Sequence, residues 1–97
     1  MTSKKEFGDF QTPDRLATMV TALVSELYGT PDSVIEPTVG LGAFLEASAA
    51  RWGNRTTYTG YDINRSYVER ARQRLRHVGA EVFERDFFLE DWGRLIS

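Results

Sequence analysis

The sequence lacks several residue types and patterns that common classes of protein need. Its 97 residues include no cysteine, which excludes disulfides and thiolate metal sites, and only one histidine, which leaves no His/Cys cluster for a metal. No run approaches the ~18 apolar residues of a membrane span, and no apolar segment of a signal peptide follows the first lysines. We therefore expect a soluble, cytoplasmic chain that contacts no membrane and binds no metal.

The chain also lacks an excess of either charge. Twelve Lys and Arg residues against fourteen Asp and Glu residues give a net charge of −2, without the broad basic footprint of a nucleic-acid-binding surface. If nucleic acid is a partner, most of the groups that hold it must lie outside this chain. The 41% of hydrophobic residues is enough for a packed core, and the length allows one domain at most.

Helical periodicity marks a first helix near the start of the chain. Thr12 is the expected N-cap and Pro13 the first helical residue, and the pattern continues to about residue 28, before Gly29. Apolar residues at three- and four-residue steps should bury one face of this helix against the core. They are Leu16, Met19 or Val20, Leu23 and Leu27.

Two further helices follow. The first covers residues 43–52, which are rich in helix formers and are followed by a glycine. The second covers about residues 66–78, and its start is marked by a capping box of Ser66 and Glu69.

Three short strands alternate with these helices, at residues 33–36, 56–62 and about 80–85. Alternation of strand and helix predicts an α/β fold with a parallel sheet and right-handed crossovers. The expected architecture is a partial doubly wound, Rossmann-like sheet of about three strands with flanking helices. Ligands of such sheets bind beyond the carboxyl ends of the strands.

The unusual residues of the chain fall at these strand ends. Glu36, Asp62 and Asp86 end the three strands, and Gly40 and Gly42 form the turn after the first of them. Glycines at this turn let the backbone approach a ligand, and the N-terminus of the following helix points toward it. Taken alone, the glycines could equally serve only to make the turn.

The second strand end narrows the ligand class. Asp62 lies 20 residues after Gly42, at the end of the next strand. An acidic side chain at this spacing typically binds both hydroxyls of a cofactor ribose. The alternative is that Asp62 caps the following helix. Leu45 stands at the third glycine position of the dinucleotide fingerprint, and Glu36 would repel a pyrophosphate, so NAD is disfavoured. Glu36 suits a positively charged amino group, which S-adenosylmethionine (SAM) carries.

The third strand end offers groups for an adenine ring. Asp86 can accept a hydrogen bond from the exocyclic amine, and Phe87 can pack on the base. The alternative is that Phe87 and Phe88 are core residues and Asp86 is solvated.

These segments together resemble the SAM-dependent N6-adenine DNA methyltransferases of restriction-modification systems. Residues 36–45 resemble motif I, residues 60–64 motif II and residues 86–88 motif III. Residues 7–13 resemble motif X, which precedes motif I in this arrangement and narrows the resemblance to DNA adenine methylation. The resemblance runs from about residue 7 to residue 92, which is nearly the whole chain. It implies that residues 1–97 are the N-terminal part of one methyltransferase domain.

The resemblance implies a role for each matching position. Its cofactor is SAM, and the residues fall into three groups. Those at the methionine end are Thr12, Pro13, Glu36, Thr38 and Gly40, beside Gly42 of the glycine turn. Asp62 would bind the ribose, Ile63 and Phe87 would cover the two adenine faces, and Asp86 would bind the adenine amine.

One motif of the family has no match. The catalytic motif IV contains a Pro-Pro pair after a fourth strand, but Pro13, Pro31 and Pro37 are not adjacent. A target-recognition region is also lacking. We therefore expect no catalytic residue here, DNA contacts through regions outside this chain, and no activity of the chain alone.

In the family the strand matching residues 33–36 is central, so its open edge should pair with the missing C-terminal half, with a separate polypeptide or with a second copy.

Two alternatives to this function stay open. The chain could belong to a class I methyltransferase that acts on protein, RNA or a small molecule, because the glycine and acidic positions specify SAM and not the substrate. It could also be a non-catalytic module for nucleotide binding or assembly that keeps the fold.

Overall fold

A computed structural model describes residues 11–89 of the protein, so the part of motif X before Gln11 lies outside the described residues. Three helices and three strands alternate along this stretch, with short 3₁₀ turns between some of them. The elements are α2 (Asp14–Tyr28), β1 (Ser33–Glu36), α3 (Ala43–Trp52), β2 (Thr57–Asp62), α4 (Arg65–Arg74) and β3 (Glu81–Glu84). No helix within residues 11–89 is long and apolar enough to cross a bilayer.

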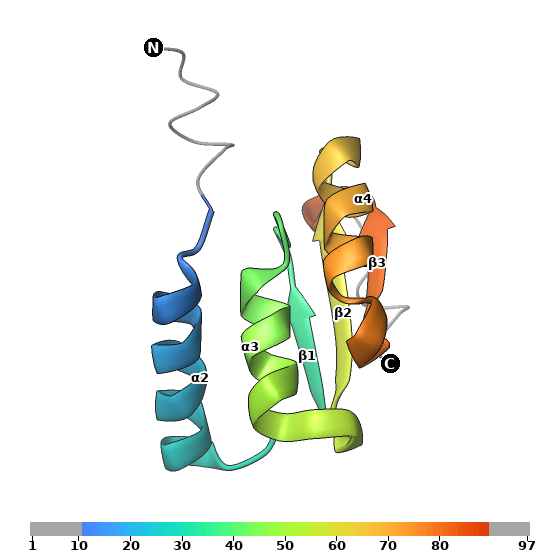
Figure 1. The fold of residues 1–97 in the computed structure, drawn as a ribbon. Helices are drawn as coiled ribbons and strands as arrows, with labels where there is room; N and C mark the ends of the chain where they lie inside the picture. Colours follow the sequence, from blue (N-terminus) through green and yellow to red (C-terminus); the bar gives the residue numbers. More distant parts are fainter. Residues whose placement is uncertain (1–10, 90–97) are drawn as a thin grey trace.

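The strands form one parallel sheet in the order β1-β2-β3, which confirms the predicted partial α/β fold. The register joins Glu36 of β1 to Gly60 of β2, and Asp62 of β2 to Glu84 of β3. Helices α3 and α4 lie along the sheet, and α2 lies beside α3 on the side away from β2 (Figure 1). The carboxyl ends of all three strands point to the same end of the molecule.

The core lies between the sheet and helices α3 and α4. Its largest fully buried apolar side chains are Leu45, Val68 and Leu75. Gly60 in the middle strand makes this packing possible, because a Cβ there would lie 2.6 Å from a methyl group of Val39. The glycine therefore lets the loop after β1 and helix α3 approach the sheet closely.

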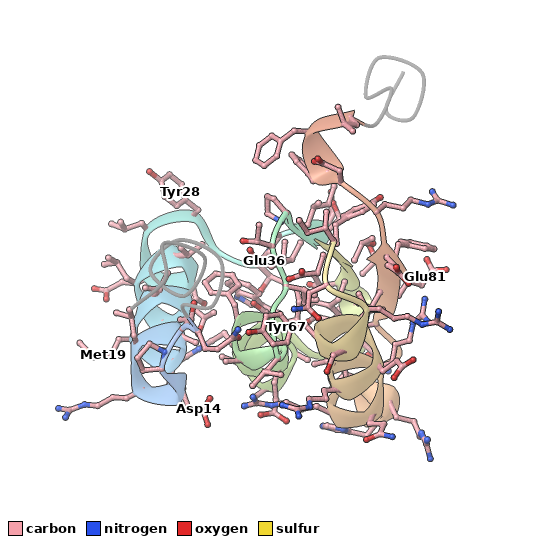
Figure 2. All side chains as sticks on the ribbon, turned by 90° about the horizontal axis from the view of Figure 1, so that it is seen from above. Asp14, Met19, Tyr28, Glu36, Tyr67 and Glu81 are labelled. Atoms are coloured by element: carbon pink, nitrogen blue, oxygen red, sulfur yellow. The ribbon has the colours of Figure 1, made fainter. Side chains whose placement is uncertain are left out.

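The prediction for the first helix was right about its extent to within one residue and wrong about its buried face. The side chains that α2 buries are small ones, Ala17 and Thr21, which face α3. The expected apolar face is exposed instead. Its exposed members are Leu16 (45%), Met19 (58%), Leu23 (55%) and Leu27 (63%). The reason is that α2 packs sideways on α3 and has none of the described strands beneath it. Met19 lies on the side of α2 away from α3 (Figure 2).

Three predicted helix boundaries also differ from the structure. Pro13 has an extended ψ of 142° and takes the N-cap position expected for Thr12, so α2 begins one residue later. Asn64, and not Ser66, caps α4: its side-chain oxygen accepts a hydrogen bond of 3.2 Å from the backbone N–H of Tyr67. Helix α4 ends at Arg74, and a 3₁₀ turn continues the chain to residue 78.

Candidate functional site

The three acidic residues lie at the carboxyl edge of the sheet. Glu36 and Asp62 are the last residues of β1 and β2, and Asp86 follows β3 by two positions. Because Glu36 pairs with Gly60 and Asp62 pairs with Glu84, Asp62 lies two residues beyond the level of Glu36, and Asp86 lies two residues beyond the level of Asp62. The staggered edge carries two adjoining hollows, described next.

The first hollow has a volume of about 120 Å³ and opens between the start of α2 and the loop after β1. Its lining residues are Gln11, Thr12, Glu36, Thr38, Val39, Ala43 and Phe44. Glu36 is half-buried there, and this burial raises the pKa of its carboxyl, although a hydrogen bond from the backbone N–H of Thr38 (3.3 Å) acts in the opposite direction. A half-buried carboxylate that makes no ion pair within residues 11–89 favours a positively charged ligand group, which would restore its ionised form.

The second hollow, of about 170 Å³, lies between the ends of β2 and β3. Its lining residues are Pro37, Thr38, Asp62, Ile63, Arg85, Asp86, Phe87 and Phe88. Thr38 lines both hollows, so the two are neighbours at one edge of the sheet. The structure thus brings together Thr12, Glu36 and Thr38 in one hollow, and Asp62, Ile63, Asp86 and Phe87 in the other.

Two backbone groups hold the side chain of Asp62 at the second hollow. Its Oδ2 accepts a hydrogen bond of 3.0 Å from the backbone N–H of Gly40, and its Oδ1 accepts one of 2.8 Å from the backbone N–H of Asn64. A carboxylate has about four lone-pair sites, so each oxygen keeps capacity for another donor. The carboxylate therefore fixes two loops and still offers two acceptor atoms to a ligand.

The glycine turn takes its shape from both of its neighbours. Gly40 has a φ of +55°, and the side chain of Gln11 crosses it so closely that a Cβ would clash with the amide oxygen. The same oxygen accepts a hydrogen bond of 2.9 Å from the backbone N–H of Leu41. Sequence reasoning had included Gln11 only as part of motif X; its role in holding the turn depends on a contact between residues 30 apart, which no local pattern shows.

Three predicted site residues line neither hollow. Pro13 is exposed at the start of α2, and Gly40 contributes its backbone to the turn. Gly42 has a φ of +93° and is buried against α4, where a Cβ would lie 3.2 Å from a methyl carbon of Leu75. Gly42 therefore allows the start of α3 to pack closely against the end of α4.

The groups predicted to hold an adenine ring also have contacts within the chain. Asp86 accepts a hydrogen bond of 2.9 Å from the backbone N–H of Phe88, which caps a 3₁₀ turn (Phe87–Leu89). The ring of Phe87 stands edge-on to Tyr61, with centroids 5.8 Å apart. Ile63 is 73% exposed above the second hollow. Between Ile63 and the ring of Phe87, the hollow offers apolar surfaces from two different strand ends.

Arg74 is a further residue that sequence reasoning did not single out. Its guanidinium contacts Glu46 of α3 at 2.8 Å and Asp14 of α2 at 2.9 Å, and it reaches the carbonyl oxygen of Leu41 at 3.5 Å. It thus joins α4 to both other helices and to the glycine turn. In the sequence it stands among four arginines of one helix, and only the fold distinguishes it from the others.

Comparisons with known proteins agree with this fold. No family model matches the sequence. The chain is 36% identical over 98 aligned positions to the type II methyltransferase M.NspV from a Nostoc species, an alignment that covers 98% of this chain and 20% of that protein. The chain thus spans about a fifth of the length of this relative.

Two solved structures share the fold. The type I restriction-modification methyltransferase subunit from Streptococcus thermophilus superimposes with a TM-score of 0.71 at 22% identity, over 87% of this chain and 20% of that one. A methyltransferase from Geobacter sulfurreducens superimposes with a TM-score of 0.60 at 21% identity, over 87% of this chain and 44% of that one. The sequence match and the shared fold together confirm the predicted resemblance: the chain is similar in sequence to a segment of a type II methyltransferase, and it has the fold of other methyltransferase structures.

Proposed function

We propose that this chain is the SAM-binding segment of an N6-adenine DNA methyltransferase and that it is inactive without the rest of that enzyme. The observation that carries the proposal is the carboxylate of Asp62. Two backbone N–H groups hold it at the edge of a hollow whose other surfaces include Ile63 and Phe87. A fixed pair of acceptor oxygens beside apolar surfaces fits a ribose joined to a flat base.

The first hollow fits the other end of the same cofactor. The half-buried carboxyl of Glu36 suits the ammonium of the methionine part, and Thr38 lines both hollows. Thr12 lines the same hollow and could contact this end. SAM supplies a methyl group on a sulfonium sulfur, and the residues of this chain bind and orient the molecule that carries it.

The adenine substrate requires groups from elsewhere. The methyl acceptor is an exocyclic amine that must leave the DNA stack before it can meet the sulfonium methyl. No residue of this chain matches the family's catalytic motif, and the net charge of −2 does not favour the DNA backbone. The rest of the enzyme therefore has to bind DNA and hold the flipped adenine.

Calorimetric titration tests the proposal directly. SAM should bind wild-type chain, and Asp62→Asn should weaken binding by tenfold or more, because a hydrogen bond to a charged group contributes about 1.5 to 3 kcal/mol. The matched control is Asp32→Asn, because Asp32 precedes β1 at the opposite end of the sheet and, within residues 11–89, offers only its backbone oxygen to a neighbour. NADH should not bind. Equal binding of SAM to wild type and to Asp62→Asn would contradict the proposal.

A non-catalytic assembly module is the second candidate. Asp62 and Asp86 both accept backbone N–H groups, so they could stabilise the loops without any ligand. The titration separates the two candidates, since an assembly module that has lost the cofactor site would bind neither SAM nor NADH.

A further inference from the structure

The loop between β1 and α3 finds acceptors for its backbone donors within the chain. Five consecutive N–H groups have partners among residues 11–89. The pairs are Thr38 with the Glu36 carboxyl (3.3 Å), Val39 with the carbonyl of Tyr61 (2.7 Å), Gly40 with the Asp62 carboxylate (3.0 Å), Leu41 with the Gln11 amide oxygen (2.9 Å) and Gly42 with the carbonyl of Val39 (2.9 Å). In other glycine turns, successive N–H groups form a concave set of donors that binds phosphate. Here these five donors are already used.

Gln11 differs from the other two side chains that fill these donors. Glu36 and Asp62 carry acidic groups at strand ends, and each fits one end of the proposed ligand. Gln11 precedes α2, lies 30 positions before Leu41 and brings an uncharged amide. Substituting Gln11 therefore frees one donor of the turn without removing an acidic group from either hollow.

The side chain of Gln11 also occupies the space beside Gly40. A Cβ on Gly40 would clash with the amide oxygen of Gln11 and would lie 3.1 Å from the carboxamide carbon. A glycine with a φ of +55° commonly serves the close approach of another group to the backbone. In dinucleotide-binding turns the group that approaches is the pyrophosphate. In this chain it is the amide of Gln11.

We propose that Gln11 is a specificity-determining residue: its amide oxygen takes the place of a phosphate oxygen at the glycine turn, so the site excludes nucleoside diphosphates. The inference rests on the proposed function, because it explains why the site would accept SAM, which has no phosphate, and reject ADP or NADH. Thr38 lines both hollows. A 5′ pyrophosphate on a nucleoside in the second hollow would therefore enter the first, which Gln11 lines.

Two side chains of the first hollow oppose a phosphate, and they do so in different ways. Glu36 repels it by charge. Gln11 takes the N–H of Leu41, the donor that the phosphate would need. Because the two effects have different causes, removing both should favour a phosphate more than removing either one.

Calorimetric titration with adenosine and ADP tests the inference. The two ligands share the nucleoside, so the ratio of their dissociation constants reports on the phosphates. Wild-type chain should bind ADP no more tightly than adenosine. Gln11→Ala should shift the ratio toward ADP by at least tenfold, the effect of one hydrogen bond to a charged group. The double variant Gln11→Ala with Glu36→Gln should shift it further.

Two control variants separate this role from a structural one. Gln11→Glu keeps an acceptor for the N–H of Leu41 and should not shift the ratio toward ADP. Gln73 is an exposed glutamine of α4, and Gln73→Ala should change the ratio less than twofold. If Gln11 only stabilised the fold, Gln11→Ala would weaken both ligands in parallel and leave their ratio unchanged.

Proton–nitrogen NMR follows the freed donor directly, without a nucleoside. Added pyrophosphate should shift the amide signal of Leu41 in the Gln11→Ala chain and leave this signal in place in the wild type. Equal responses of the two chains would contradict the role of Gln11.

The outcomes distinguish this inference from the proposed function. An unchanged ratio in Gln11→Ala would overturn the inference, whereas SAM binding by the wild type would leave the proposed function intact. A wild-type chain that binds ADP tenfold more tightly than adenosine would overturn the inference as well. A wild-type chain that binds adenosine but not SAM would contradict the proposed function, and a gain of ADP affinity in Gln11→Ala would still support the role of Gln11.

Discussion

Asp62 at the end of β2 accepts a hydrogen bond from the backbone N–H of Gly40, 22 residues earlier, across a distance of 3.0 Å. The other oxygen of the same carboxylate holds the N–H of Asn64, which caps α4. One side chain therefore joins the glycine turn, the end of the middle strand and the start of a helix. Any ligand that uses this carboxylate meets a group already held in place, which lowers the cost of ordering on binding.

Loss of the Asp62 carboxylate should destabilise the chain even without a ligand. Asp62→Ala leaves the N–H groups of Gly40 and Asn64 without their acceptor, so we expect a loss of about 1 to 3 kcal/mol in the free energy of unfolding. Urea denaturation followed by circular dichroism measures it. Asp32→Ala, whose side chain has no such partners within residues 11–89, should change the stability by less than about 0.5 kcal/mol. Equal effects of the two substitutions would contradict the role of Asp62.

The sequence predicted the strands and the order of elements well, because strand ends and glycine turns are local signals. The buried face of α2 was not predictable, because the periodicity of Leu16, Leu23 and Leu27 shows that the helix has an apolar face but not which element covers it. The roles of Gln11 and Gly42 were missed for a related reason. Both depend on contacts with residues at least 30 positions away, with Leu41 and Leu75 respectively.

Gly60 should not tolerate a methyl group. A Cβ at this position would lie 2.6 Å from Val39 and 3.1 Å from Leu45, so Gly60→Ala forces overpacking at the base of the glycine turn. We expect a loss of about 1 to 3 kcal/mol, measured by urea denaturation. The double variant Gly60→Ala with Val39→Ala should recover part of this loss, because it removes the nearest atoms. A double variant whose loss equals the sum of the two single losses would show that Val39 is not the obstacle.

Glu36 should make the stability of the unliganded chain depend on pH. Burial raises the pKa of its carboxyl in the folded state above the ordinary 4.5, so the folded state keeps the proton at pH values where the unfolded state has released it. This preference stabilises the fold below the unfolded-state pKa and is lost as the pH rises through the folded-state pKa. Glu36→Gln, which keeps an acceptor for the N–H of Thr38, should therefore raise the Tm at pH 7 and leave it unchanged near pH 3.

The same substitution should act in the opposite direction on cofactor affinity. Glu36→Gln removes the charge proposed for the ammonium of SAM, so the Kd measured by calorimetry at pH 7 should rise about tenfold, the effect of losing one hydrogen bond between charged groups. If Glu36→Gln is more stable at pH 7 and also binds SAM more weakly, the charge of Glu36 serves the ligand at a cost to the stability of the unliganded fold. A variant with unchanged affinity would remove Glu36 from the proposed site and leave its effect on stability intact.

Arg74 should contribute more to stability than any exposed ion pair of the same helix. Its guanidinium joins Glu46, Asp14 and the carbonyl of Leu41, and 29% of its side chain is exposed. We expect Arg74→Met to cost about 1.5 to 3 kcal/mol of unfolding free energy, the contribution of hydrogen bonds between charged groups. Arg74→Lys should not restore this stability, because an ammonium cannot reproduce the planar set of donors.

Arg65→Met is the control for this prediction. The ion pair of Arg65 with Glu69 is exposed on both sides, and its loss should cost less than about 0.5 kcal/mol of unfolding free energy in urea denaturation. Similar losses for Arg74→Met and Arg65→Met would mean that the contacts of Arg74 with α2, α3 and the glycine turn add nothing to the stability of the fold.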